Sequence, residues 1–145
     1  MSPLQSLEGF SARKEFPLTL NLGQVIDILE AKLLVGNDRH LALDVKTAFS
    51  ADLMSDVLAF AKSGSLILTG LTTPQVVRTA SILDAIALII VRGKIPARET
   101  LKLAEELDIP VLSTGYILFE TSGRLYANGI VGCVEKIGGI NNTES

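Results

Sequence analysis

The sequence predicts an α/β fold of three layers, in which a mainly parallel sheet carries helices on both faces. From Ser65 onward, segments with strand character alternate with segments whose apolar residues recur at helical spacing. One of them, residues 85–91, is apolar throughout, as is typical of a strand covered on both sides. The connections between these segments are short, which favours right-handed crossovers and therefore a parallel sheet.

The N-terminal part predicts one helix and two extended segments outside this alternation. Asn21 is placed to cap the helix, and Gln24, three residues later, completes a capping box. The apolar face of this helix comprises Leu22, Val25, Ile26 and Leu29. Turn residues 36–38 separate a short apolar strand, 33–35, from a second extended segment, 41–50. Because this part does not follow the regular alternation, we expect it to add an edge to the sheet.

The next predicted helix begins at Asp52, a plausible cap, and stops at residues 63–64. Its apolar side comprises Leu53, Val57, Leu58 and Ala61. A strand at 66–69 and a loop at 70–73 follow. Pro74 fits the first position of the helix after that loop, because its missing N–H is not needed there. The apolar residues of that helix are Val76, Val77, Ala80, Ile82 and Leu83.

The C-terminal half continues the alternation. It predicts a strand at 88–91, a helix at 97–107, a strand at 110–114 and a helix at 116–127. In the first of these helices the buried stripe is expected to comprise Leu101, Ala104 and Leu107, with charged residues on the opposite side.

The length and composition indicate a single domain of 145 residues. We expect that domain over residues 18–131, between a flexible leader, 1–17, and a polar tail, 132–145. The net charge of −3, without a basic stripe, removes the usual driving force for nucleic-acid binding. The longest apolar run is too short for a membrane span, and the N-terminal stretch lacks the order of a signal peptide. Cys133 is the only cysteine, which fits a cytoplasmic location.

Several segments together resemble a DRTGG domain. They are 45–58 (VKTAFSADLMSDVL), 109–114 (IPVLST), 119–120 (FE) and 123–126 (GRLY). The resemblance extends over about residues 19–130, nearly the whole ordered chain. The family signature ends in two glycines, and we place Thr47 and Ala48 at those positions. Backbone geometry that only glycine adopts is therefore not expected there.

The resemblance implies a fold and a general role. DRTGG domains are similar to the N-terminal domain of HPr kinase/phosphorylase, and they occur beside CBS domains in some pyrophosphatases and within some phosphate acetyltransferases. They are regarded as regulatory or dimerising modules without assigned chemistry. For this chain the resemblance implies an α/β fold, a homodimer and no catalytic activity of its own. It names no ligand. No cofactor is expected.

Hydroxyl side chains follow two of the predicted parallel strands and form the best candidate ligand site. Thr69, Thr72 and Thr73 surround the loop after one strand, and Ser113 and Thr114 end another. Because ligands bind beyond the carboxyl ends of parallel strands, and helix N-termini attract anions, these groups are expected to line one crevice. The alternative is that Thr73 simply caps the helix that Pro74 begins.

Two groups of cations lie near this crevice. Arg78, on the helix after the threonine loop, can reach an anion or simply face the solvent. Arg92 and Lys94 flank Gly93, an arrangement that suits a strand-to-helix turn as well as a phosphate contact.

Three further groups are candidates for acid, base or nucleophile. Asp52 and Asp56 are four residues apart and would share a helical face, as an acid–base or metal-binding pair, or as a cap and a solvated carboxylate. His40, the only histidine, is expected in an exposed turn, although it has the chemistry of a base or phosphoacceptor. No general base is identifiable for Cys133, which indicates an unreactive thiol.

These observations favour a non-enzymatic regulatory or interaction module, a homodimer that senses a small anionic or nucleotide-like ligand. Hydrophobic residues make up 48% of the chain, which supports a face for self-association. Two other hypotheses stay open. One is a small enzyme that acts on a phosphorylated substrate at the threonine crevice with Asp52 or His40. The other is a docking partner of a kinase or phosphotransferase component.

Overall fold

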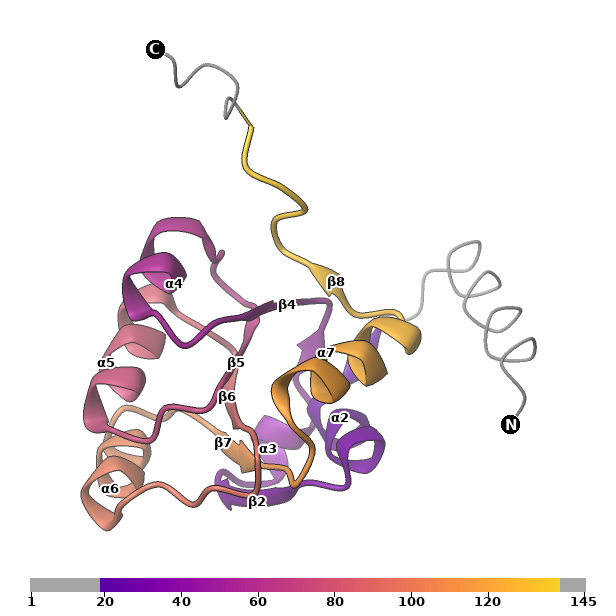
Figure 1. Cartoon of the computed structure of the whole chain (residues 1–145). Helices are drawn as coiled ribbons and strands as arrows, with labels where there is room; N and C mark the ends of the chain where they lie inside the picture. The colour runs from indigo at the N-terminus through magenta and orange to yellow at the C-terminus, as the bar shows by residue number, and fades with distance from the viewer. Residues whose placement is uncertain (1–18, 139–145) are drawn as a thin grey trace.

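A computed structural model describes residues 19–138 and confirms the three-layer α/β architecture (Figure 1). In chain order the elements are β1 (Leu20–Asn21), α2 (Leu22–Leu29), β2 (Lys32–Val35), α3 (Asp38–Leu41), β3 (Asp44–Val45), β4 (Thr47–Ser50), α4 (Met54–Phe60), β5 (Leu66–Thr69), α5 (Pro74–Leu83), β6 (Ala87–Ile90), α6 (Arg98–Glu106), β7 (Val111–Ser113), α7 (Leu118–Ala127) and β8 (Val131–Gly132). The leader, 1–17, and residues 139–145 of the predicted tail lie outside the described residues.

The central sheet has six strands in the order β2-β7-β6-β5-β4-β8. Strands β4, β5, β6 and β7 run parallel, so their carboxyl ends share one edge of the sheet. Strand β2 pairs antiparallel with β7, which confirms that the N-terminal part adds an edge. At the other side of the sheet β8 pairs parallel with β4.

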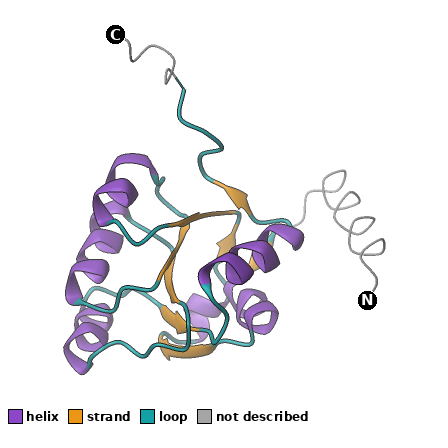
Figure 2. Cartoon of the chain, viewed as in Figure 1, coloured by secondary structure: helices purple, strands orange, loops and turns teal. Residues whose placement is uncertain are grey.

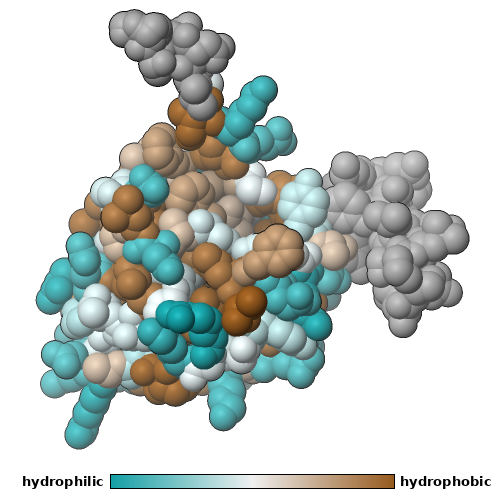
Figure 3. Space-filling model, in the orientation of Figure 1, coloured by the Kyte–Doolittle hydropathy of each residue, from teal (hydrophilic) through white to brown (hydrophobic). Residues whose placement is uncertain are grey.

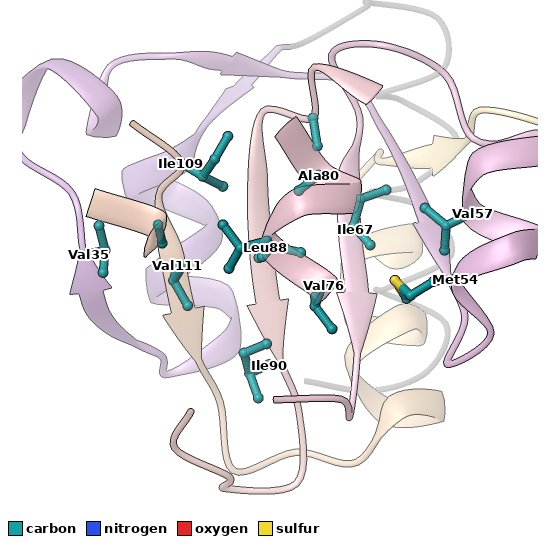
Figure 4. Packing of buried hydrophobic residues seen from close by; sticks show 13 residues of the cluster. Val35, Met54, Val57, Ile67, Val76, Ala80, Leu88, Ile90, Ile109 and Val111 are labelled. Carbon is teal, nitrogen blue, oxygen red and sulfur yellow. The ribbon is translucent and has the colours of Figure 1, made fainter. Parts of the chain in front are cut away.

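Helices cover both faces of this sheet (Figure 2). Helices α4, α5 and α6 pack side by side on one face, and α2 and α7 pack together on the other. Each face has its own cluster of buried apolar residues. Figure 4 shows the cluster beneath α5, in which Ile67 and Leu88 from neighbouring strands point toward Val76 and Ala80. Strands β5 and β6 are buried at every residue, as their apolar sequences predict.

The way the helices begin separates them into two groups. Helix α2 has the predicted capping box between Asn21 and Gln24, with both bonds at 2.8 Å. Helix α3 has one between Asn37 and His40. Helices α4, α5, α6 and α7, which all begin near the carboxyl edge of the sheet, have no side-chain cap. Pro74 occupies the first position of α5, as predicted.

Several local expectations are wrong. Residues 36–38 do not form a simple turn, because Asn37 caps the short helix α3. The carboxylate of Asp52 does not cap α4, whose N-cap position is Leu53. In α4 Val57 is buried as predicted, but the other buried residue is Met54, and the predicted Leu53 and Leu58 are exposed. Two further predicted core residues, Ile82 and Leu107, are also exposed. None of the helices in residues 19–138 is long and apolar enough to cross a membrane.

Candidate functional site

The candidate site lies at the carboxyl edge of the sheet, where the loops after β4 and β5 are joined by Asp52. Its Oδ1 accepts the backbone N–H of Gly70 at 2.8 Å and the hydroxyl of Thr69 at 3.0 Å. The N–H of Gly70 is the main cause that holds the pKa of Asp52 below its usual value, and the Thr69 hydroxyl acts in the same direction. Asp52 is therefore a fixed, ionised carboxylate that ties two loops together.

The cations of the site stand in the next loop, after β6. Arg92 and Gly93 both adopt the left-handed backbone region, with φ of 66° and 67°. Their N–H groups donate at 2.8 Å to the carbonyls of Tyr116 and Thr114, so this turn is anchored to the loop after β7. The charges of Arg92 and Lys94 both lower the pKa of Asp52, although less than its hydrogen bonds do.

Gly70 permits the Arg92 guanidinium to lie against the backbone of the threonine loop. A Cβ atom at position 70 would be 3.1 Å from Nη2 of Arg92. The side chains of Arg92 and Lys94 are exposed, and within residues 19–138 neither forms a direct ion pair. Two cations thus face the solvent beside the uncapped N-termini of α5 and α6, where backbone N–H groups also favour an anion.

The structure brings the predicted hydroxyls to this edge, but it turns three of them inward. Thr69 is fully buried and donates to Asp52, while the N–H of Leu71 donates to its oxygen. Ser113 donates to the carbonyl of Lys94 at 2.9 Å. Thr114 donates to the carbonyl of Leu29 at 2.7 Å. These three hydroxyls hold loops in place.

The other predicted side chains of the crevice are more accessible. Thr72 is half-buried, and its carbonyl accepts the Thr100 hydroxyl at 2.8 Å. Thr73 stands at the N-cap position of α5, as the alternative predicted, but its hydroxyl makes no capping bond. Arg78 is exposed on the second turn of α5.

The two aspartates of the predicted acidic pair do not share a helical face. Asp52 precedes α4 and is turned toward Gly70, whereas Asp56 is an exposed residue in the first turn of the helix. Within residues 19–138 no three His, Cys, Asp or Glu side chains gather as metal ligands.

His40 is the clearest correction, because it is buried and not exposed in a turn. Its side chain has a relative exposure of 4%. Its Nδ1 accepts the N–H of Asn37 at 3.1 Å, so Nε2 carries the proton and donates to Asp108 at 3.0 Å. Arg39 also donates to Asp108, at 2.9 Å, and holds the pKa of that carboxyl below its usual value. Asp108 precedes β7, so this cluster lies at the amino edge of the sheet, opposite Asp52.

A stacked pair that the sequence did not indicate stands next to the loop that carries Arg92 and Lys94 (the cationic loop). The guanidinium of Arg124 lies 3.9 Å from the centre of the Tyr116 ring. The Tyr116 hydroxyl donates to Glu30 at 2.6 Å, which raises the pKa of the phenol. Tyr116 and Arg124 are eight residues apart, and Tyr116 precedes α7 while Arg124 lies within it, so the sequence spacing does not indicate the contact.

The fold and the site together define a class of protein. It is a small α/β domain whose sheet has helices on both faces and exposed cations at the edge where the parallel strands end. Comparison with known families is more specific, because the model of the DRTGG domain matches residues 24–127. The chain therefore belongs to the DRTGG domain family. A search of curated proteins found no match.

Among solved structures, the chain is similar to the CBS and DRTGG domains of the regulatory region of Clostridium perfringens pyrophosphatase, complexed with its activator diadenosine tetraphosphate. The TM-score is 0.67 at 18% sequence identity, and the match covers 90% of this chain. The chain spans 60% of the length of that structure. At this identity the similarity shows the shared fold.

Proposed function

We propose that the protein is a non-enzymatic regulatory module that binds a small anionic or nucleotide-like ligand at the carboxyl edge of its sheet. The observation that carries the proposal is the exposed pair Arg92 and Lys94, which stands beside two uncapped helix N-termini. Cations and backbone N–H groups together are the usual means of holding phosphate. The activator in the C. perfringens regulatory region is a dinucleotide tetraphosphate, which supports the same ligand class here.

The arrangement of the titratable groups supports a binding role over a catalytic one. His40 and Asp52, the two candidate acids or bases, lie at opposite edges of the sheet. The lowered pKa of Asp52 makes it a poor proton acceptor near neutral pH. Both groups already have fixed partners within the protein.

We also propose that the module acts as a homodimer. Large apolar side chains are exposed on several elements, with Phe119 at 84% and Ile82 at 75% relative exposure. Figure 3 shows such side chains between polar ones on the face that includes α7. Light scattering at two protein concentrations tests this part of the proposal. A mass of twice 15.5 kDa supports it, and a strict monomer would overturn it.

The ligand proposal is tested by thermal unfolding with diadenosine tetraphosphate, ATP and inorganic tripolyphosphate. A ligand at about a hundred times its Kd raises Tm by roughly 5–10 °C for a domain of this size. We expect Arg92→Gln and Lys94→Gln to reduce that shift. Lys62→Gln, which removes an exposed cation just before β5, is the matched control and should leave the shift intact. No shift with any of the three compounds would overturn the proposed ligand class.

A further inference from the structure

A cavity of about 230 Å³ lies between β4, α7 and the segment that follows α7. Strand β8 closes one side of it, because Gly132 pairs with Ala48 and the N–H of Cys133 donates to the Ala48 carbonyl at 3.2 Å. Ser50, the last residue of β4, also lines the cavity. It is therefore next to the carboxyl edge at which the cationic loop stands.

The lining of this cavity combines apolar surface with one aromatic ring. Leu68 and Leu125 are both fully buried. Tyr126 adds an aromatic ring that is more than half exposed, whereas the side chain of Phe49 packs on the other face of the sheet. Such a lining favours a planar, aromatic occupant, because stacking on aromatic side chains does not depend on a particular pattern of hydrogen bonds.

Two hydroxyls add polarity to this lining. The Oγ atoms of Ser50 and Ser122 are 2.8 Å apart and bond to each other. Either hydroxyl can be the donor, so the pair can present a proton or a lone pair to a third group. A heterocyclic base carries both donors and acceptors on its edge, and the serine pair suits either kind.

The size of the cavity limits the occupant. A cavity of about 150 Å³ accepts a benzene ring, whereas sites for whole ligands occupy about 300 Å³ or more. At about 230 Å³ the space suits a bicyclic ring but not an entire nucleotide. The rest of the ligand would lie outside, along the carboxyl edge. Strands β4 and β6 are separated by β5 alone, hence by about 10 Å, and the cationic loop follows β6.

We infer that this cavity holds the heterocyclic base of a nucleotide whose phosphates lie at Arg92 and Lys94. The inference rests on the proposed function and adds the source of selectivity for nucleotides over simple polyanions. The cations and helix N-termini bind the phosphates. The ring of Tyr126 and the serine pair bind the base.

Calorimetric titration of the full chain with ATP, GTP and inorganic tripolyphosphate tests the inference. At least one nucleotide should bind about tenfold or more tightly than tripolyphosphate, the effect expected of one stacked base. Ser122→Leu should remove that advantage, because leucine fills the cavity, and it should leave the affinity for tripolyphosphate unchanged. Leucine suits a half-exposed position on α7, so this variant should fold.

Two further variants make the result decisive. Ser55→Leu places the same residue at an exposed position on α4 and should change neither affinity. Tyr126→Leu should weaken nucleotide binding alone, about tenfold. If both nucleotides bind no tighter than tripolyphosphate, or if Ser122→Leu and Tyr126→Leu leave nucleotide affinity intact, the base site is overturned while anion binding stands. If none of the three compounds binds, the proposed function fails as well.

Discussion

Replacement of Asp52 by alanine should destabilise the domain by about 2 kcal/mol. The carboxylate is the acceptor for two donors, the N–H of Gly70 at 2.8 Å and the hydroxyl of Thr69 at 3.0 Å. Both donors belong to buried residues, and an unpaired buried donor costs about 1–3 kcal/mol. Because Asp52 itself is exposed, solvent screens its charge, and we therefore expect about 1 kcal/mol for each bond.

Urea unfolding measures this difference. For a slope of about 2 kcal/mol per molar urea, a loss of about 2 kcal/mol lowers the midpoint by about 1 M. The matched control is Asp56→Ala, an exposed carboxylate in the first turn of α4, which should lose no more than about 1 kcal/mol through the helix dipole. If the two variants unfold within about 0.5 kcal/mol of each other, the role of Asp52 as a tie between loops is refuted.

The pH dependence of the same variant gives a second test with a definite sign. The pKa of Asp52 is lowered in the folded state, mainly by the N–H of Gly70. Its contribution to stability is therefore present above the unfolded-state pKa of about 3.9 and is lost as the pH falls through the folded-state pKa. The difference between wild type and Asp52→Asn should be constant from pH 7 to about pH 5 and should shrink below about pH 4.

Three other substitutions test the structure elsewhere. His40→Leu should cost about 2 kcal/mol in urea unfolding, because it leaves the backbone N–H that Nδ1 accepts without a partner. Gly132→Ala should loosen β8, since a Cβ there would lie 2.9 Å from a backbone oxygen, and the thiol of Cys133 should then react faster with a disulfide reagent. Leu68→Ala should lose about 2–5 kcal/mol by cavity formation, whereas Ile82→Ala, at an exposed position, should stay within about 0.5 kcal/mol of wild type.

The order of strands and helices was predictable because the buried faces of these elements require apolar residues at regular spacing in the sequence. Strand β6 is apolar at every residue, and it is buried at every residue between two layers of helices. The spacing was less informative for α4, where Val57 is buried as expected but Leu53 and Leu58 are exposed and Met54 takes their place in the core. A helix of seven residues has only two turns, so an apolar residue on either side fits the pattern equally well.

The surroundings of the polar residues could not be predicted in the same way. His40 is buried because its partner, Asp108, lies 68 residues away and reaches it only through the pairing of β2 with β7. Local sequence shows a histidine between Arg39 and Leu41, which is typical of an exposed turn. Asp52 was expected to cap its own helix, yet the competing donors in the loop after β5 hold it.

The hydroxyl side chains at the strand ends lie where the sequence predicted, but they do not face a ligand. The pattern placed Thr69, Ser113 and Thr114 at one edge, and each of them is there. Each hydroxyl, however, donates to a group of the protein, and among residues 19–138 no buried side-chain nitrogen or oxygen lacks a partner. Ser113 holds the carbonyl of Lys94, and the Thr114 carbonyl holds the N–H of Gly93, so these residues fix the backbone of the cationic loop.

The difference in role between the buried hydroxyls and the exposed cations follows from the dielectric environment at the edge of a sheet. A buried hydroxyl gains most from a fixed partner, because an unpaired one is costly where water cannot replace the bond. A cation such as Arg92 gains most from the solvent boundary, where it keeps its hydration until an anion displaces the water. Loss of the Ser113 hydroxyl should therefore weaken ligand binding only by loosening the loop, whereas loss of the Arg92 charge should weaken it directly and reduce its dependence on salt. If the Ser113→Ala variant binds the ligand more weakly than the Arg92→Gln variant does, this assignment of roles is refuted.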